Sequence, residues 1–276
     1  MTKILIIGKK SYIGSNLYKY FKHKTNHFVN VIDYNLFKKK KKNYIKKFDY
    51  LINCSSNKKY LSNKYNNKND HDFYIAKKLA NTKVTLIFLS TRKVYKPKFN
   101  IKETDKLRPS CTYSKNKLKT EINLKKILHQ KKLLIFRISN VIGFSIINQN
   151  RKLHFNFIDH FFSSIKKNYI YENGSIYKDF ISIEKMCEII NISIKKKIYG
   201  IYNLSLGKKI YLNTLIKWLN FYNNKEIIFK KQKKNFNKDS FTLNNNKLLK
   251  TLRIKNKVND LKLYCIKISK QFFKKR

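Results

Sequence analysis

A tyrosine and a lysine four residues apart are the side chains in this sequence best suited to proton transfer. Tyr113 and Lys117 open a segment whose spacing predicts a helix, with an apolar stripe formed by Leu118, Ile122, Ile127 and Leu128. Residues four apart share one helix face, so we expect the ammonium to lower the phenol's pKa from its usual value of about 10. Such a phenol can take a proton from an alcohol while hydride leaves the same carbon, or return a proton to a ketone.

The spacing alone carries little information, because the chain is rich in both residue types. Tyr-x-x-x-Lys occurs six times, starting at Tyr18, Tyr20, Tyr34, Tyr60, Tyr74 and Tyr113. Tyr113 differs in position, since it follows the predicted buried strand 84–89 at an interval that lets its side chain reach the strand's carboxyl end. The same strand exits through Ser90 and Thr91. We therefore expect the Thr91 hydroxyl near the phenol, with simple strand-end capping as its alternative role.

The elements that must position these groups begin at the amino terminus. Residues 4–7 are an unbroken apolar run, typical of a strand buried on both faces of a parallel sheet. A glycine ends the run, Ile13, Leu17 and Phe21 then recur at helical spacing, and residues 29–33 follow as a second strand. Strand, turn, helix and strand are how a dinucleotide-binding fold begins, although any α/β domain can start with a strand and a helix.

The turn between the first strand and helix is the predicted diphosphate site. Gly8, Ser11 and Gly14 form Gly-x-x-Ser-x-x-Gly, with serine where many such turns have a middle glycine. The backbone N–H groups of Tyr12 and Ile13, at the helix start, are expected to face a diphosphate. The hydroxyl of Ser11 is itself able to donate to a phosphate.

The next two strand ends predict the adenosine side of the same site. Asp33 ends the second strand, where a carboxylate can accept both ribose hydroxyls. The buried strand in residues 49–56 ends in small residues, including Ser55, that permit close approach of a ligand. Five lysines at 38–42 are interpreted as a solvated loop, or alternatively as a 2′-phosphate site for NADP. Asp33 would repel that phosphate, so NAD is favoured.

Strands and helices alternate along the first half of the chain. The expected elements are a polar loop at 60–72, helices at 73–80 and about 155–166, and strands at 84–89 and 133–143. This pattern predicts an α/β fold with a doubly wound parallel (Rossmann) sheet. We expect an NAD(P)-binding domain at 1–143 and a smaller α/β substrate-binding lobe at 144–276, interleaved with the first in space.

The charge of the chain is extreme. Its 276 residues include 64 lysines and arginines against 15 acids, a net charge of +49, and six of the 64 are arginine. Proteins that grip nucleic acid usually use arginine and concentrate charge on one face, whereas here lysine is spread from end to end. We interpret the lysine as compositional bias at tolerant surface positions. Nucleic acid is then expected to bind only nonspecifically and in a salt-sensitive way.

Cysteine spacing and hydropathy exclude several other classes. The four cysteines are far apart and form no C-x-x-C, and the six histidines lack ligand spacing, so neither a metal site nor a disulfide framework is predicted. No segment reaches the roughly 18 apolar residues of a membrane span. The first residues are predicted as a core strand and not a signal peptide, so we expect a cytoplasmic location.

In order and spacing, these motifs resemble the extended short-chain dehydrogenase/reductases, specifically the NAD-dependent nucleotide-sugar epimerase/dehydratase group. The resemblance covers roughly residues 3–207. It rests on Gly8-x-x-Ser11-x-x-Gly14, Asp33, residues 49–56, Ser90-Thr91-x-x-Val94-Tyr95, Glu103, Pro109, Tyr113-x-x-x-Lys117, Glu121, Arg137-x-x-Asn140-x-x-Gly143, Lys178-Asp179-Phe180-Ile181 and Gly200-x-Tyr202-Asn203.

The resemblance implies a role for each site residue. Tyr113 would be the catalytic acid/base, Lys117 would hold the nicotinamide ribose and tune the phenol, and Thr91 would hydrogen-bond the reacting sugar oxygen. Asn140 would contact the diphosphate or base of the substrate, with strand-end capping as its alternative role. Lys178 stands where family members have arginine, which keeps a charge for phosphate but loses the bidentate fork.

The implied activity is NAD-dependent epimerisation of a nucleotide sugar. Dehydratases of the group look like Thr-Asp-Glu before Val-Tyr, and Arg92 and Lys93 replace the two acids here, so dehydration is disfavoured. The shortened segment between Asp33 and Asp49 is similar to the family's sugar-ketone reductases. An NAD(P)H-dependent 4-keto nucleotide-sugar reductase is therefore the first alternative.

A non-catalytic member that binds RNA or a protein partner is the alternative from another class. It is motivated by the net charge, by Ser11 and by the changed Lys178 region. The family often pairs through the helix that bears the catalytic tyrosine, so a homodimer is expected by analogy.

Overall fold

A computed structural model describes residues 1–143, 157–165, 169–172, 176–224, 228–231 and 239–273. Its centre is a six-stranded sheet with the spatial order β2, β1, β3, β4, β5, β10, in which every pairing is parallel. The strands are β1 (Lys3–Ile7), β2 (Phe28–Ile32), β3 (Tyr50–Asn53), β4 (Thr85–Thr91), β5 (Leu133–Ile138) and β10 (Gly200–Leu204). Strand order reverses between β1 and β3, and ligands of such sheets bind outside the carboxyl ends at that point.

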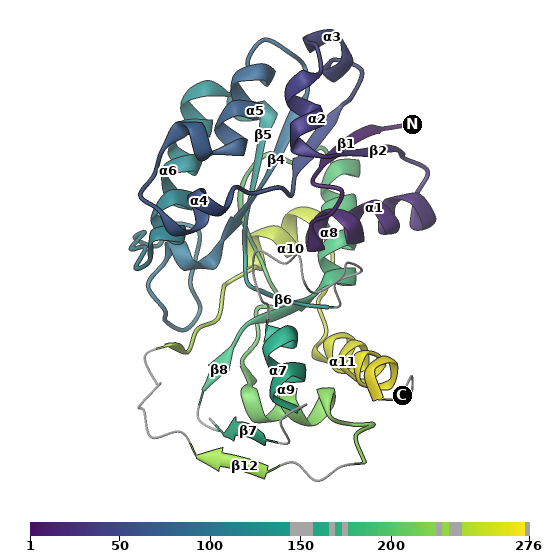
Figure 1. Ribbon diagram of the computed structural model, residues 1–276, viewed down its shortest axis with the longest axis vertical. Coiled ribbons are helices and arrows are strands. Elements are labelled where there is room, and N and C mark those ends of the chain that lie inside the picture. Colours follow the sequence, from purple (N-terminus) through teal and green to yellow (C-terminus); the bar gives the residue numbers. More distant parts are fainter. Residues whose placement is uncertain (144–156, 166–168, 173–175, 225–227, 232–238, 274–276) are drawn as a thin grey trace.

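Helices cover both faces of the sheet (Figure 1). Ile4 and Ile6 pack into one core with α1 and α8, while Leu5 and Ile7 pack into the other with α2, α3, α5 and α6. This is the doubly wound arrangement that the sequence predicts, and that prediction is confirmed. The helices are α1 (Tyr12–Lys24), α2 (Tyr34–Lys39), α3 (Lys42–Ile45), α4 (Lys58–Ser62), α5 (His71–Leu79), α6 (Thr112–Ile127), α7 (Phe157–Ile165), α8 (Ile183–Lys195), α9 (Leu212–Leu219), α10 (Asn246–Leu252) and α11 (Val258–Phe273).

A third core lies below the sheet in Figure 1 and joins α7, α9 and α11. Short strand pairs accompany it: β6 (Asn140–Ile142) with β9 (Phe180–Ser182), β8 (Tyr177–Lys178) with β11 (Ile210–Tyr211), and β7 (Tyr169–Glu172) with β12 (Ile228–Lys231). Strand β10 and helices α8 and α10 follow residue 143 yet belong to the sheet and its flanking layer. The division of the chain at residue 143 stays a prediction.

Two segments expected as loops are partly helical. Lys38 and Lys39 end α2 and Lys42 begins α3, with Lys40 and Lys41 between them, and Phe37 and Ile45 of these helices are fully buried. Residues 60–72 contain the end of α4, a 3-10 turn (Asn67–Asn69) and the start of α5, and Tyr60 is 4% exposed. The lysines do face solvent as predicted, but the expectation that both segments are loops is wrong for their helical parts, because single aromatic and aliphatic side chains anchor these polar segments to the sheet.

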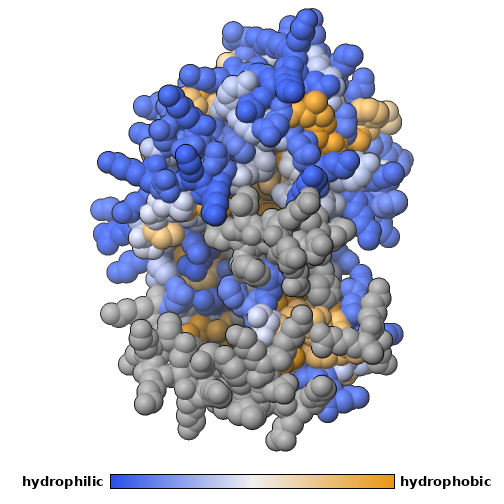
Figure 2. Space-filling view, viewed as in Figure 1, coloured by the Kyte–Doolittle hydropathy of each residue, from blue (hydrophilic) through white to orange (hydrophobic). Residues whose placement is uncertain are grey.

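On the face drawn in Figure 2, hydrophilic side chains cover most of the surface around the sheet. Further 3-10 turns span Arg92–Val94 and Gln130–Lys132.

Within the described segments, no helix is both long enough and apolar enough to cross a bilayer.

Candidate active site

The turn after β1 is built for close backbone approach. Gly8 has φ +109°, a conformation that side chains disfavour, and a Cβ on Gly14 would lie 2.4 Å from the Gly8 carbonyl oxygen. The Ser11 hydroxyl donates to that carbonyl (2.9 Å) and accepts the Gly14 N–H (2.9 Å). The hydroxyl is therefore committed to the helix cap and does not point its proton at a ligand. The N–H groups of Tyr12 and Ile13 in the first turn of α1 are what this turn offers to an anion.

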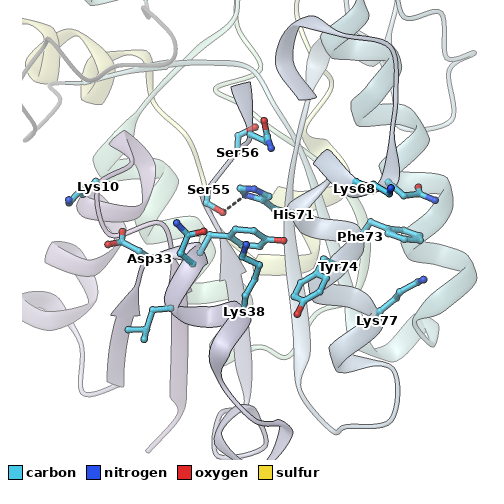
Figure 3. A pocket seen from close by; sticks show the side chains of 15 residues that line it. Lys10, Asp33, Lys38, Ser55, Ser56, Lys68, His71, Phe73, Tyr74 and Lys77 are labelled. Carbon is cyan, nitrogen blue, oxygen red and sulfur yellow. Dashed lines mark hydrogen bonds between the residues drawn. The ribbon is translucent and has the colours of Figure 1, made fainter. Parts of the chain in front are cut away.

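A pocket of about 1030 Å³ lies beside this turn, at the carboxyl ends of β2 and β3 (Figure 3). Asp33 lines it and is exposed, with no hydrogen bond from its side chain to the α2 cap that it begins. Ser55 lines it from the end of β3. The structure thus places the two predicted adenosine-side residues in one cavity. Four lysines share its wall: Lys10, Lys38, Lys68 and Lys77.

An aromatic pair forms part of the same wall. The Tyr34 ring stacks on the His71 ring with centroids 3.4 Å apart and planes at 11°. Burial lowers the pKa of His71 to about 4, helped by Lys38 and Lys117, so its ring is neutral at pH 7. His71 Nδ1 lies 3.0 Å from Ser55 Oγ, an interaction drawn in Figure 3. Sequence reasoning missed both rings in this role, since Tyr34 was one of six similar tyrosines and His71 fell in a supposed loop.

Helix α6 brings the predicted acid/base pair to the end of β4. Lys117 Nζ donates to the carbonyl oxygen of Leu89 (3.0 Å), two residues before Thr91. Thr91 ends β4, and its Oγ1 accepts the N–H of Lys93 (3.3 Å), which leaves the hydroxyl's own proton for another acceptor. Tyr113 lies one turn before Lys117 on α6 and within electrostatic reach of Tyr60, over whose ring Lys117 Nζ also lies. The helix and strand that carry Thr91, Tyr113 and Lys117 therefore meet at one sheet edge.

The buried side of α6 is more polar than the predicted stripe. Leu118, Ile127 and Leu128 pack against the cores as predicted, whereas Ile122 is 41% exposed. Ser114, Asn116, Thr120 and Glu121 are buried with Leu124. Asn116 Nδ2 donates to the carbonyl oxygens of Tyr60 and Asn63, so this face is fixed by hydrogen bonds as well as by packing.

A buried ion pair joins several of the sequence motifs behind the site. Arg137 Nη2 donates to Glu121 Oε2 (2.7 Å), and both side chains are at most 2% exposed. Ser90 Oγ donates to the other carboxylate oxygen at 2.5 Å. Arg137 Nη1 donates to the Tyr95 hydroxyl (2.8 Å), which donates to Asn203 Oδ1 (3.0 Å). These contacts tie α6, β5, β10 and the turn after Thr91 into one network.

The predicted substrate-side residues lie lower in the molecule. Lys178 Nζ pairs with Asp239 (3.2 Å), and Asn140 opens β6, where its N–H donates to the Asp179 carbonyl oxygen (3.3 Å). Arg92 is 7% exposed, and its guanidinium stacks on the Phe241 ring, 3.8 Å from the centroid. Arg92 is thus a packed cation. It stands at one of the two positions where the dehydratase pattern has an acid.

The family model for the NAD dependent epimerase/dehydratase family matches residues 4–205. The chain belongs to this family. The match spans the sheet, the Gly8 turn, the Tyr113 helix and β10. No curated protein sequence matches the chain.

Solved structures of family enzymes share the fold. A UDP-N-acetylglucosamine 4-epimerase from Methanobrevibacter ruminantium M1, in complex with UDP-N-acetylmuramic acid, superposes with TM-score 0.82 at 19% identity, covering 100% of this chain and 99% of that one. A UDP-glucose-4-epimerase from Stenotrophomonas maltophila with bound NAD and formylated UDP-arabinopyranose gives 0.78 at 13%, covering 100% of both. A dTDP-4-dehydrorhamnose reductase from Yersinia enterocolitica gives 0.73 at 18%, covering 99% and 100%.

Membership makes the chain one of the NAD-dependent epimerase/dehydratase enzymes, and NAD is the cofactor of the family. The residues present fit that cofactor. A Cβ at Gly8 would lie 2.9 Å from the Cys54 carbonyl carbon, so the backbones just after β1 and β3 meet closely at the crevice in which such sheets bind their ligands. The pocket that Asp33 lines lies beside it.

Proposed function

We propose that this chain is an NAD-dependent nucleotide-sugar epimerase, which oxidises a sugar hydroxyl transiently and reduces the resulting ketone on its other face. The observation that carries the proposal is the contact of Lys117 Nζ with the Leu89 carbonyl oxygen. It fixes α6 against the end of β4, so that Tyr113 and Thr91 belong to the same edge as the cofactor crevice.

Each residue has a defined task in this proposal. Bound NAD supplies the acceptor and then the donor of hydride. Tyr113, as phenolate, takes the proton of the sugar hydroxyl and returns it when the ketone is reduced, so protons and electrons balance over the cycle. Lys117 donates one N–H to Leu89, which leaves two donors for the nicotinamide ribose and the Tyr113 phenol. Thr91 donates its hydroxyl proton to the reacting oxygen.

The remaining predicted site residues complete the proposal. Tyr12 and Ile13 offer backbone N–H groups to the cofactor diphosphate in the cradle formed by Gly8, Ser11 and Gly14, and Asp33 and Ser55 hold the adenosine side. Asn140 and Lys178 contact the substrate's diphosphate. Since Lys178 already pairs with Asp239, substrate binding must compete with that exposed carboxylate.

A one-way reduction of a 4-keto nucleotide sugar is the second candidate. Four lysines on the wall of the adenosine pocket favour it. Their positive charge exceeds the negative charge of Asp33 and would attract the 2′-phosphate of NADPH. Such a reductase would use the same Tyr113 and Lys117 but would consume NADPH.

The test begins with mass spectrometry of the cofactor that copurifies with the protein, followed by a panel of nucleotide sugars. We expect NAD in the protein and epimerised product without loss of the absorbance of reduced cofactor. Stoichiometric loss of that absorbance would favour the reductase. Salt-sensitive RNA binding without any NADH binding would favour the non-catalytic alternative.

Tyr113→Phe provides the residue-level test. Loss of a general acid/base typically lowers the rate by about 10²–10⁴-fold. Tyr18→Phe is the matched control, because Tyr18 and Lys22 have the same spacing on α1 and form a cation–π contact at 6.0 Å. Equal activity of Tyr113→Phe and the parent would remove the catalytic assignment.

A further inference from the structure

A buried carboxylate lies behind the catalytic lysine. Asp72, in the first turn of α5, is 4% exposed. Its Oδ2 lies 3.9 Å from Lys117 Nζ, and its Oδ1 accepts Asn53 Nδ2 at 2.9 Å. An ionised carboxylate in such a place needs a compensating cation, and Lys117 is the one within ion-pair distance among the residues described.

Among the described residues, Leu89 accepts the one hydrogen bond that the Lys117 ammonium donates. It donates to Leu89 at 3.0 Å, whereas the 3.9 Å separation from Asp72 is a charge contact beyond hydrogen-bonding distance. The Phe88 ring lies under it, 4.5 Å from Nζ to centroid. A polar ligand that accepts from Nζ can therefore draw the ammonium away from Asp72 without breaking a short contact.

A hydrogen-bonded chain connects Asp72 to the wall of the adenosine pocket. Ser55 Oγ donates to Asn53 Oδ1 (2.7 Å), and His71 Nδ1 lies 3.0 Å from the same Oγ. Because the hydroxyl has one proton, His71 must donate to it, which fixes the tautomer with the proton on Nδ1. This series of contacts, which ends at Lys117, follows the carboxyl end of β3 beneath the crevice proposed for the cofactor.

We propose that Asp72 is a positioning residue for Lys117, a buried counter-ion that holds the ammonium beside Leu89. When a ribose replaces Asp72 as the partner of the ammonium, the carboxylate binds a proton. This rests on the proposed function, because it assumes that Lys117 meets the nicotinamide ribose. Asp72 itself touches neither cofactor nor substrate.

The charges around Asp72 determine the direction in which NADH affinity changes with pH. Burial raises the pKa of Asp72 to about 7; Lys117 lowers it and Asp70 raises it. The titratable groups that act on Asp72 from the packed elements are Lys117 on α6, Asp70 at the N-cap of α5, Cys54 after β3, Tyr34 on α2 and Tyr60 on α4. Drawing Lys117 away removes the lowering influence, so Asp72 takes up a proton on binding. NADH should then bind more tightly at acidic pH and lose affinity as pH rises through neutrality.

The experiment is NADH binding to the wild-type protein from about pH 6 to about pH 8, by fluorescence titration and by calorimetry in two buffers of different ionisation enthalpy. For each unit by which NADH binding raises the pKa of Asp72, the affinity for NADH falls about tenfold as the pH rises from the pKa of the free protein to that of the complex. We expect that loss and a net uptake of protons at neutral pH. Binding without proton uptake overturns the proposal, and this measurement needs no variant.

Asp72→Asn should bind NADH with the pH dependence removed, while Asp105→Asn, which removes a partly exposed carboxylate paired with Lys98, should keep the wild-type slope. Thermal unfolding of each variant checks that the fold is retained. A slope that persists in Asp72→Asn contradicts the role assigned to this residue. Absence of NADH binding at every pH refutes the proposed function itself, whereas binding with no proton uptake refutes only the counter-ion.

Discussion

Removal of the negative charge at Glu121 should be the most damaging polar substitution in the core. The carboxylate accepts four hydrogen bonds, at 2.5–3.2 Å, from Ser90 Oγ, from Arg137 Nε to both oxygens and from Arg137 Nη2. In Glu121→Gln one acceptor becomes an NH₂ donor that faces the arginine's own donors. Arg137, 2% exposed, would then be a buried cation without a counter-ion.

The expected loss is about 3–5 kcal/mol of unfolding free energy, the range for breaking a buried ion pair by removing one partner. This is a large fraction of the roughly 5–15 kcal/mol that a domain has in total. Urea denaturation at neutral pH measures it, with Glu184→Gln as control. Glu184 pairs with Lys267 at 2.8 Å, but both side chains are more than half exposed, so its loss should be about 0–1 kcal/mol.

A double variant separates charge from shape. Glu121→Leu combined with Arg137→Met removes both charges and should recover part of the loss, because two apolar side chains leave no unpaired ion. The Tyr95 and Ser90 hydroxyls would still lose partners, which limits the recovery. A Glu121→Gln protein that loses less than about 1 kcal/mol would refute the reasoning.

Three further substitutions probe other parts of the molecule. Gly14→Ala places a Cβ 2.4 Å from the Gly8 carbonyl oxygen, so we expect a lower melting temperature and loss of NADH binding in a fluorescence titration. Asp33→Ala should raise the affinity for NADPH relative to NADH by about tenfold, the value of one hydrogen bond to a charged group, in parallel titrations. Burial raises the pKa of Asp179 to about 7, above its unfolded value near 4, so the native state binds more protons between these values and stability falls as pH rises through that window. Urea denaturation at about pH 5 and about pH 7 should show that fall, and Asp179→Asn should reduce it.

The beginning of the fold was predictable because its signals are local. The apolar run of β1, the glycines at 8 and 14 and the carboxylate at 33 each act through their own backbone position or immediate neighbours. Tyr113 was distinguished from five similar tyrosines by its sequence interval from β4, and Lys117 on the same helix contacts the Leu89 carbonyl oxygen of that strand.

The segment before α5 could not be predicted in the same way, because its order depends on partners far along the chain. Asp70 Oδ2 accepts the hydroxyls of Tyr65 and Thr120, and Tyr60 Oη lies 2.7 Å from Thr120 Oγ1. None of these polar residues has a periodic pattern. Helix α11 was missed for a different reason: its stripe of Leu261, Cys265 and Ile268 has helical spacing, but lysines between these residues mask it.

The distribution of charge between core and surface argues for the compositional interpretation of the lysines. Within the described part of the chain no lysine is buried, whereas four of the 15 acids are: Asp70, Asp72, Glu121 and Asp179. Each of these carboxylates accepts hydrogen bonds from defined donors, so replacing it would leave those donors unpaired. Surface positions have no such constraint, and there lysine accumulates. Most of the coloured surface in Figure 2 is accordingly hydrophilic. A net charge of +49 is thus compatible with an interior whose polar network keeps its acids where the proposed chemistry and the fold need them.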